Sequence, residues 1–152
     1  MSTIHTRIAT IADLDVIAPL FDGYRQFYEQ APDPTLARRF IRERIENDES
    51  VILLAFGEDG RASGFCQLYP TFCSVEARAI YVLYDLFVTP EARRSGAGTA
   101  LLRVAEELAA ERGKTRMDLA TAKTNHAAQA LYESLGWVRD EVFYTYSKRV
   151  PR

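Results

Sequence analysis

The sequence is poor in residues that bind metals or form crosslinks, with two cysteines and two histidines among its 152 residues. Cys66 and Cys73 lie seven residues apart in a stretch with the composition of a β-strand. Side chains alternate between the two faces of a strand, so these thiols are expected on opposite faces, without a disulfide between them. His5 and His126 add only two candidate ligands, so no zinc-binding set can be assembled. We therefore expect reduced, buried thiols and no metal site.

The sequence also lacks an excess of charge and a long apolar run. Lysine and arginine total 19 against 21 aspartate and glutamate residues, a formal net charge of -2. Nucleic-acid-binding proteins usually carry a basic excess, so nucleic acid is not an expected partner and any phosphate recognition must be local. No segment approaches the roughly 20 apolar residues that cross a bilayer, and residues 1–11 contain no apolar core of signal-peptide length. These absences predict a cytoplasmic protein with no membrane partner.

The composition is otherwise that of a globular protein, with 47% hydrophobic and 26% charged residues. No repeat, low-complexity tract or linker appears, so residues 1–152 are expected to form one domain. Asp33 and Pro34 carry the signals of a helix start. The predicted strands are 3–9, 51–56, 62–72, 77–88, 116–121 and 141–148, and the predicted helices are 14–28, 34–46, 98–112 and 125–135. Strands interleaved with helices predict a mixed α/β fold.

A glycine-containing turn joins a nearly all-apolar strand to the third predicted helix. Glycine lets the backbone approach a ligand closely, and the first amides of a helix form an anion site. Arg93 and Arg94 add positive charge suited to phosphate. A nucleoside-triphosphate loop requires lysine where Thr99 stands, and the dinucleotide fingerprint requires a third glycine where Leu101 stands. The remaining pattern, Arg-x-x-Gly-x-Gly, is either a phosphate site or a tight structural turn.

The last predicted helix carries a second motif. Asn125 and Tyr132 are seven residues apart and fall on one helical face, with Gln129 between them. An adjacent apolar stripe can face the sheet, which leaves these polar groups available. Asn125 can equally be an ordinary N-cap, and Tyr132 an ordinary half-buried tyrosine.

Together these two stretches resemble the GNAT superfamily of N-acetyltransferases. The run from Arg93 to Gly98 is similar to the family signature Gln/Arg-x-x-Gly-x-Gly/Ala. Asn125 to Trp137 is similar to its second motif, here Asn-x-x-Ala-x-x-Leu-Tyr-x-x-x-Gly-Trp. The resemblance covers essentially the whole chain and implies one α/β domain, a mixed, mostly antiparallel central sheet flanked by about four helices. The chain looks most similar to spermidine/spermine and small polyamine/histone-type acetyltransferases, although Tyr84 stands where the polyamine enzymes have a glutamate base.

The resemblance also implies acetyl-CoA as the acyl donor and assigns the coenzyme A side of the site. In the family the turn holds the pyrophosphate, and the preceding strand end pairs with the pantetheine arm. The implied cofactor-binding residues are Leu86, Phe87, Val88, Arg93, Arg94, Ser95, Gly96, Ala97, Gly98, Thr99, Asn125 and Tyr132. The Val88 amide is the expected oxyanion donor, and Tyr132 is the expected acid that protonates the leaving thiolate.

The expected binding site for the amine substrate is assigned from charged and aromatic residues. Asp85 is the one charge inside a long apolar strand, and a buried carboxylate is either structural, a base or a substrate anchor. The expected substrate-binding residues are Tyr24, Tyr28, Glu29, Asp33 and Asp85. The two tyrosines can instead belong to the core, and Glu29 and Asp33 can simply face water.

The leading hypothesis is an N-acetyltransferase that acts on a small cationic primary amine by direct attack. Two alternatives stay open. One is a protein lysine or N-terminal acetyltransferase, and the other is a non-catalytic coenzyme A-binding regulator, against which Tyr132 argues. The sequence leaves the identity of the base unassigned and a homodimer open.

Overall fold

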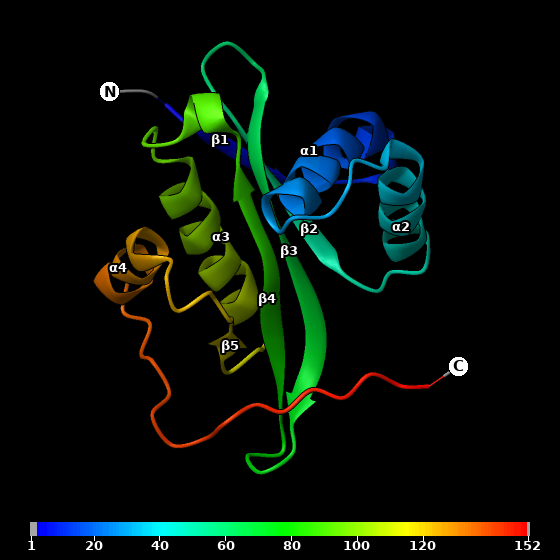
Figure 1. Ribbon diagram of the computed structural model, residues 1–152. Coiled ribbons are helices and arrows are strands. Elements are labelled where there is room, and N and C mark those ends of the chain that lie inside the picture. Colours follow the sequence, from blue (N-terminus) through cyan, green and yellow to red (C-terminus); the bar gives the residue numbers. More distant parts are fainter. Residues whose placement is uncertain (1–2, 152) are drawn as a thin grey trace. The chain divides into compact units, whose positions relative to one another are not determined.

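The computed structural model describes residues 3–151 (Figure 1). It divides into two compact units, one that ends at Ala120 and one that begins at Thr121. Each unit is described by itself, and the expectation of one domain over residues 1–152 stays a prediction.

The first unit is built on a five-stranded sheet in the order β1-β2-β3-β4-β5. The strands are β1 (His5–Ile8), β2 (Val51–Phe56), β3 (Ala62–Cys73), β4 (Arg78–Val88) and β5 (Met117–Asp118). The first four pair antiparallel with their neighbours, and β4 and β5 pair in parallel. The expected mixed, mostly antiparallel sheet is confirmed.

Three helices cover this sheet. They are α1 (Leu14–Phe27), α2 (Pro34–Glu46) and α3 (Ala97–Glu111). Figure 1 shows α1 and α2 on one side of the sheet and α3 on the other. On the α1 side, Phe21 packs against Phe65 of β3, which in turn contacts Phe87 of β4, and all three belong to one buried cluster. Burial of such aromatic side chains is the main stabilising contribution of this layer. Among the described residues, no helix is both long and apolar enough to cross a membrane.

The two leading helices begin where their sequence signals predict. The Asp33 carboxylate accepts a hydrogen bond from the Leu36 amide at 3.1 Å, and Pro34 occupies the first turn of α2. At the entry to α1, Arg7 of β1 donates two hydrogen bonds of 2.7 Å to the Asp13 carboxylate. Asp13 also accepts from the Thr10 amide at 2.9 Å. These contacts connect the first strand to the first helix.

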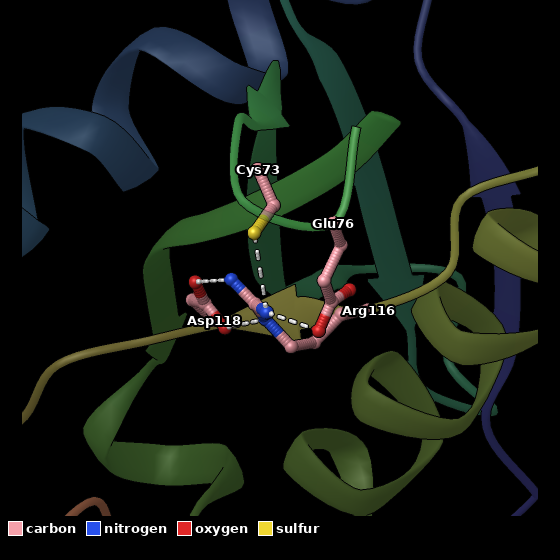
Figure 2. Close-up of polar contacts among 4 residues, drawn as sticks. All are labelled: Cys73, Glu76, Arg116 and Asp118. Atoms are coloured by element: carbon pink, nitrogen blue, oxygen red, sulfur yellow. Dashed lines mark hydrogen bonds and ion pairs between the residues drawn. The ribbon is translucent and has the colours of Figure 1, made fainter. Parts of the chain in front are cut away.

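The strand expected over 116–121 is reduced to the two residues of β5. Arg116, immediately before it, binds the tip of the β3–β4 hairpin, as Figure 2 shows. Its guanidinium lies 3.3 Å from a Glu76 carboxylate oxygen, 3.7 Å from Cys73 Sγ and 2.8 Å from an Asp118 carboxylate oxygen. Both thiols are free; Cys66 is fully buried as expected, whereas Cys73 is half-buried, contrary to the expectation. The cluster holds β5 beside the start of β4 and not beside its end.

The second unit contains α4 (His126–Ser134) and an irregular segment after it. The expectation of a strand over 141–148 is wrong. The Asp140 carboxylate accepts hydrogen bonds from the Val142 amide at 3.0 Å and the Phe143 amide at 3.2 Å. This local turn occupies amides that a strand would use in a ladder, and strand propensity alone does not supply a partner strand.

Candidate active site

A bulge on β4 changes which way its backbone points. The β3–β4 register shifts so that Gln67 pairs with Asp85 and Leu68 pairs with Leu83. Tyr84 is the extra residue on β4 and has no partner across the ladder. Its carbonyl accepts a hydrogen bond from the Tyr24 hydroxyl of α1 at 3.1 Å. The bulge therefore changes the direction in which the residues after Tyr84 point, and these residues of β4 belong to the expected site.

Beyond the bulge, alternate amides of β4 face away from β3. The Thr89 amide donates to the Ser63 carbonyl at 2.9 Å, which marks a hydrogen-bonded pair with β3. Pairing alternates along an antiparallel ladder, so Leu86 and Val88 direct their backbone groups to the opposite edge. There Arg93 Nε donates to the Val88 carbonyl at 3.3 Å. Because β5 pairs with β4 only at two earlier residues, this edge is not covered by β5.

Close approach of β3 to the end of β4 depends on Gly64. A Cβ added there would lie 2.6 Å from the Phe87 carbonyl oxygen and 3.3 Å from Val88 Cα. Real Cβ atoms do not approach a backbone oxygen so closely, so any side chain would push the strands apart. The glycine thus keeps Phe87 buried while Leu86 and Val88 stay half-buried at the open edge.

The turn after β4 adopts the backbone that its glycines predict. Gly96 has φ of 94° and is the N-cap of α3, and the preceding Arg94 has φ of 68°. Left-handed backbone is easy for glycine and strained for arginine. Nothing lies within 4 Å of a Cβ built at Gly96, so the turn is open on that side among the described residues.

The start of α3 presents amides that the helix itself cannot satisfy. The first hydrogen bond of the helix runs from the Ala100 amide to the Gly96 carbonyl at 2.9 Å. The Ala97 amide donates to Ser95 Oγ at 3.3 Å. The amides of Gly98 and Thr99 have no acceptor within the helix, because they precede its fourth residue. With the positive end of the helix dipole they form a site for an anion.

Arg93 carries a positive charge in the same turn. Besides its bond to Val88, its guanidinium lies 5.7 Å from the centre of the Phe27 ring, a cation–π contact with α1. Arg94 and Glu91 are both exposed. The predicted strand–turn–helix is confirmed, with a turn from Arg93 to Gly96 and α3 beginning at Ala97, whereas contact of these residues with a phosphate stays a prediction.

Asp85 lies on the α1 side of β4 and is 3% exposed. Gln67 Nε2 donates a short hydrogen bond to its carboxylate, so the buried charge has a side-chain partner on the neighbouring strand. Burial raises the pKa of Asp85 to about 6, although hydrogen bonds from Gln67 and Tyr24 act to lower it. A carboxyl group with such a pKa can gain and lose a proton near neutral pH.

The structure brings only some of the expected substrate-binding residues together. Tyr24 lies against Asp85, and its ring centre is 5.2 Å from that of Tyr28. Burial and the Asp85 charge raise the pKa of Tyr24. Glu29 is exposed in the loop after α1, and the Asp33 carboxylate caps α2. The role of Asp33 is therefore at least partly structural.

A groove of about 400 Å³ lies beside this cluster. Its lining is mostly apolar and comes from α1, from the start of β3 and from the segment after β4. Its lining residues are Val16, Pro19, Leu20, Gly23, Ala62, Phe87, Thr89, Pro90 and Glu91. Phe87, which also contacts Tyr24 with ring centres 6.5 Å apart, connects the groove to the Asp85 side of the strand.

The family model for the acetyltransferase (GNAT) family matches residues 17–137, about four fifths of the sequence. The chain belongs to the GNAT family. Members of this family use acetyl-CoA, and the protein is an acetyl-CoA-dependent N-acetyltransferase. The expected resemblance is confirmed at this level, and no closer relationship to the polyamine or histone enzymes is shown.

Three similar proteins support the family assignment. The uncharacterized N-acetyltransferase YhfO of Bacillus subtilis (strain 168) is 47% identical over 97% of this chain and 98% of its own. A D-amino-acid N-acetyltransferase of Saccharomyces cerevisiae is 31% identical over 82% of this chain and 79% of its own. A crystal structure of a probable acetyltransferase superimposes with a TM-score of 0.90 at 38% identity, covering 97% of this chain and 99% of that one.

The residues of the turn fit the pyrophosphate of coenzyme A. Two amides at the start of a 15-residue helix and the dipole of that helix form an anion site in this turn, and Arg93 of the same turn adds a positive charge. This GNAT chain further directs the backbone of Leu86 and Val88 to an edge at which an amide-bearing chain can pair as an added strand.

The second motif of this GNAT chain lies in the second unit. Asn125 is the N-cap of α4, with its side chain accepting from the Ala128 amide at 3.2 Å. The ring centre of Tyr132 lies 6.1 Å from that of Trp137. The ordinary capping role considered for Asn125 is present, and the catalytic role of Tyr132 stays a prediction.

Sequence reasoning missed Gln67 and Ser50. Gln67 is fully buried on β3, and its Oε1 accepts from Ser50 Oγ at 2.7 Å. A polar residue within the apolar run from Phe65 to Leu68 was the available signal, because buried amides require partners. Its pairing with Asp85 could not be predicted without the register of β3 and β4.

Proposed function

We propose that this enzyme acetylates the primary amine of a small cationic molecule by direct attack on acetyl-CoA. The observation that carries the proposal is the arrangement of β4. One strand offers a buried carboxylate with a raised pKa on its α1 side and, three residues later, a backbone amide on an open edge. These are the two groups that amine deprotonation and oxyanion stabilisation require.

The acceptor is proposed to approach from the α1 side of the sheet. Asp85 there attracts a cation, and the half-buried Tyr24 and exposed Tyr28 supply aromatic faces that favour cations. Glu29, exposed in the adjacent loop, adds a second negative charge. The yeast relative is named for amino acids, which are small amines, and this supports a small acceptor over a protein.

The donor is proposed to bind at the turn and along the open edge. Acetyl-CoA supplies the acetyl group as a thioester. The residues that would hold it are those predicted from Leu86 to Thr99, together with Asn125. The Val88 amide would donate to the carbonyl oxygen as negative charge develops there, a contribution worth about 3–4 kcal/mol in other acyl-transfer enzymes.

Tyr132 is proposed to protonate the departing thiolate. A phenol with a pKa of about 10 can donate to a thiolate whose conjugate acid has a pKa of about 8.5 in the cysteine reference. The second motif supports this assignment, and the contact with Trp137 restrains the ring of Tyr132.

The test is release of coenzyme A thiol from acetyl-CoA across a panel of acceptors. The panel contains diamines and polyamines, aminoglycosides, amino acids, a lysine peptide, a peptide with a free N-terminus and neutral amides as controls. We expect turnover with small cationic amines. Turnover only with peptides would replace the small acceptor by a protein. Coenzyme A binding without turnover on any amine would refute the proposed reaction.

A further inference from the structure

Four polar side chains form a continuous chain through the α1 side of the sheet. Ser50 Oγ, just before β2, lies 2.7 Å from Gln67 Oε1. Gln67 Nε2 donates to the Asp85 carboxylate, and Tyr24 of α1 lies within hydrogen-bonding reach of the same carboxylate. Gln67 is 0% exposed and Asp85 is 3% exposed, whereas Tyr24 is half-buried.

The ionised Asp85 carboxylate determines the orientation of the Gln67 amide. A carboxylate only accepts hydrogen bonds, so the NH₂ group of Gln67 faces Asp85. The Gln67 oxygen then faces Ser50, whose hydroxyl donates to it. Because Gln67 is fully buried, turning the amide would place its oxygen against the carboxylate without a donor, at a cost of about 1–3 kcal/mol. The carboxylate of Asp85 is thereby held from the interior side.

Tyr24 connects Asp85 with the exterior. Its hydroxyl has one proton and lies near two acceptors, the Asp85 carboxylate and the Tyr84 carbonyl at 3.1 Å. The Tyr84 carbonyl is available because the bulge leaves that residue without a ladder partner. Gln67 is fully buried, so a proton that leaves or reaches Asp85 through a hydrogen-bonded side chain passes the Tyr24 hydroxyl.

We propose that Tyr24 relays a proton from the bound acceptor ammonium to Asp85, and that Gln67 and Ser50 are positioning residues for this carboxylate. The Tyr24 oxygen accepts a proton from the ammonium while its own proton passes to Asp85. The step converts an ammonium and a carboxylate into a neutral amine and a carboxylic acid, and Tyr24 is unchanged. This inference rests on the proposed function.

The surroundings favour a relay over ionisation of the tyrosine. Burial and the Asp85 charge raise the pKa of Tyr24, so its hydroxyl stays protonated at neutral pH. The other titratable groups that face Asp85 are Cys66 and Tyr69 of β3, and burial and the Asp85 charge also raise both of their pKa values. Tyr84, 67% exposed, lies beside it on β4. Tyr24 is the hydroxyl that is both partly exposed and hydrogen-bonded to the carboxylate.

The experiment compares pH profiles of kcat/KM for wild type, Tyr24→Phe and the control Tyr81→Phe, with acetyl-CoA and the best amine of the panel. Tyr81 is a buried tyrosine on β4 outside the site. We expect Tyr24→Phe to lose on the order of 10²-fold at pH 7.5. The loss should shrink toward pH 9.5, because an amine with a pKa of about 10.4 is then about a tenth neutral in solution. Tyr81→Phe should follow the wild-type profile.

A second variant tests the positioning residues. The Gln67 hydrogen bond lowers the pKa of Asp85, so Gln67→Met should move the acidic limb of the profile to higher pH. A purely structural role would lower the rate without moving that limb. Coenzyme A affinity from calorimetry and the circular dichroism spectrum establish that each variant is folded.

Two outcomes overturn the inference, and they differ from failure of the proposed function. A Tyr24→Phe loss that is constant between pH 6 and 9.5, or no loss, overturns the relay. An unmoved acidic limb in Gln67→Met overturns the positioning role. If wild type releases no thiol with any amine, the proposed function fails and the relay fails with it.

Discussion

Replacing Asp85 by asparagine should make the protein more stable at neutral pH. The pKa of this carboxyl is raised in the folded chain, so the folded chain holds more protons than the unfolded chain between about pH 4 and pH 6. The contribution of Asp85 to stability is therefore fully present below about pH 4 and is lost as pH rises through 6. Asparagine stays neutral at every pH, can accept from Gln67 and can donate to the Tyr24 oxygen.

The magnitude follows from the two pKa values. The pKa of Asp85 in the folded chain, about 6, lies about 2 pH units above its ordinary value of 3.8. At 1.36 kcal/mol per unit this corresponds to about 3 kcal/mol lost between pH 4 and pH 7. Asp85→Asn should recover part of it, about 1–3 kcal/mol at pH 7.5. Such a gain at the expense of activity is typical of residues retained for function.

Urea unfolding followed by circular dichroism between pH 4.5 and pH 8 measures the effect. The free energy of unfolding of the variant minus that of wild type should be smallest at pH 4.5 and should grow with pH until about pH 7. Asp13→Asn is the matched control with the opposite sign. Arg7 lowers the pKa of Asp13, so this variant should lose about 1–2 kcal/mol at pH 7 and approach wild type as pH falls. A destabilised Asp85→Asn at pH 8, or a difference independent of pH, would refute the reasoning.

Three further predictions concern the turn, the second motif and the cap of α2. Gly98→Val should raise the dissociation constant of coenzyme A, and unchanged calorimetric binding in this variant would rule out the phosphate site. Removal of Arg93 should weaken coenzyme A binding more at low salt than at high salt. Tyr132→Phe should lower turnover by about 10²-fold with coenzyme A affinity retained, and wild-type turnover across the pH range would end the general-acid assignment. Asp33→Ala should destabilise the protein by about 1 kcal/mol, because the Leu36 amide loses its acceptor; equal urea midpoints would contradict the capping role.

The positions of most elements and of the turn followed from the sequence because their causes are local. Asp33 and Pro34 start α2 through contacts that span three residues. The φ of Gly96 follows from the lack of a Cβ, and α3 follows from apolar residues at helical spacing. The identity of the family likewise came from two short motifs. The prediction of a strand over 141–148 was wrong because a strand requires a partner strand, and the alternation of side chains does not provide one.

The sequence by itself therefore determined the helices, the long strands, the glycine turn and the membership of the GNAT family. Only the tertiary structure decided the register of β3 and β4, which places the bulge at Tyr84 and directs the Val88 amide to the open edge. It also decided that Gln67, 18 residues away in the chain, binds Asp85 and that Tyr24, on another element, lies beside both. These contacts depend on how separate elements pack, and no periodicity or motif within a single element encodes them.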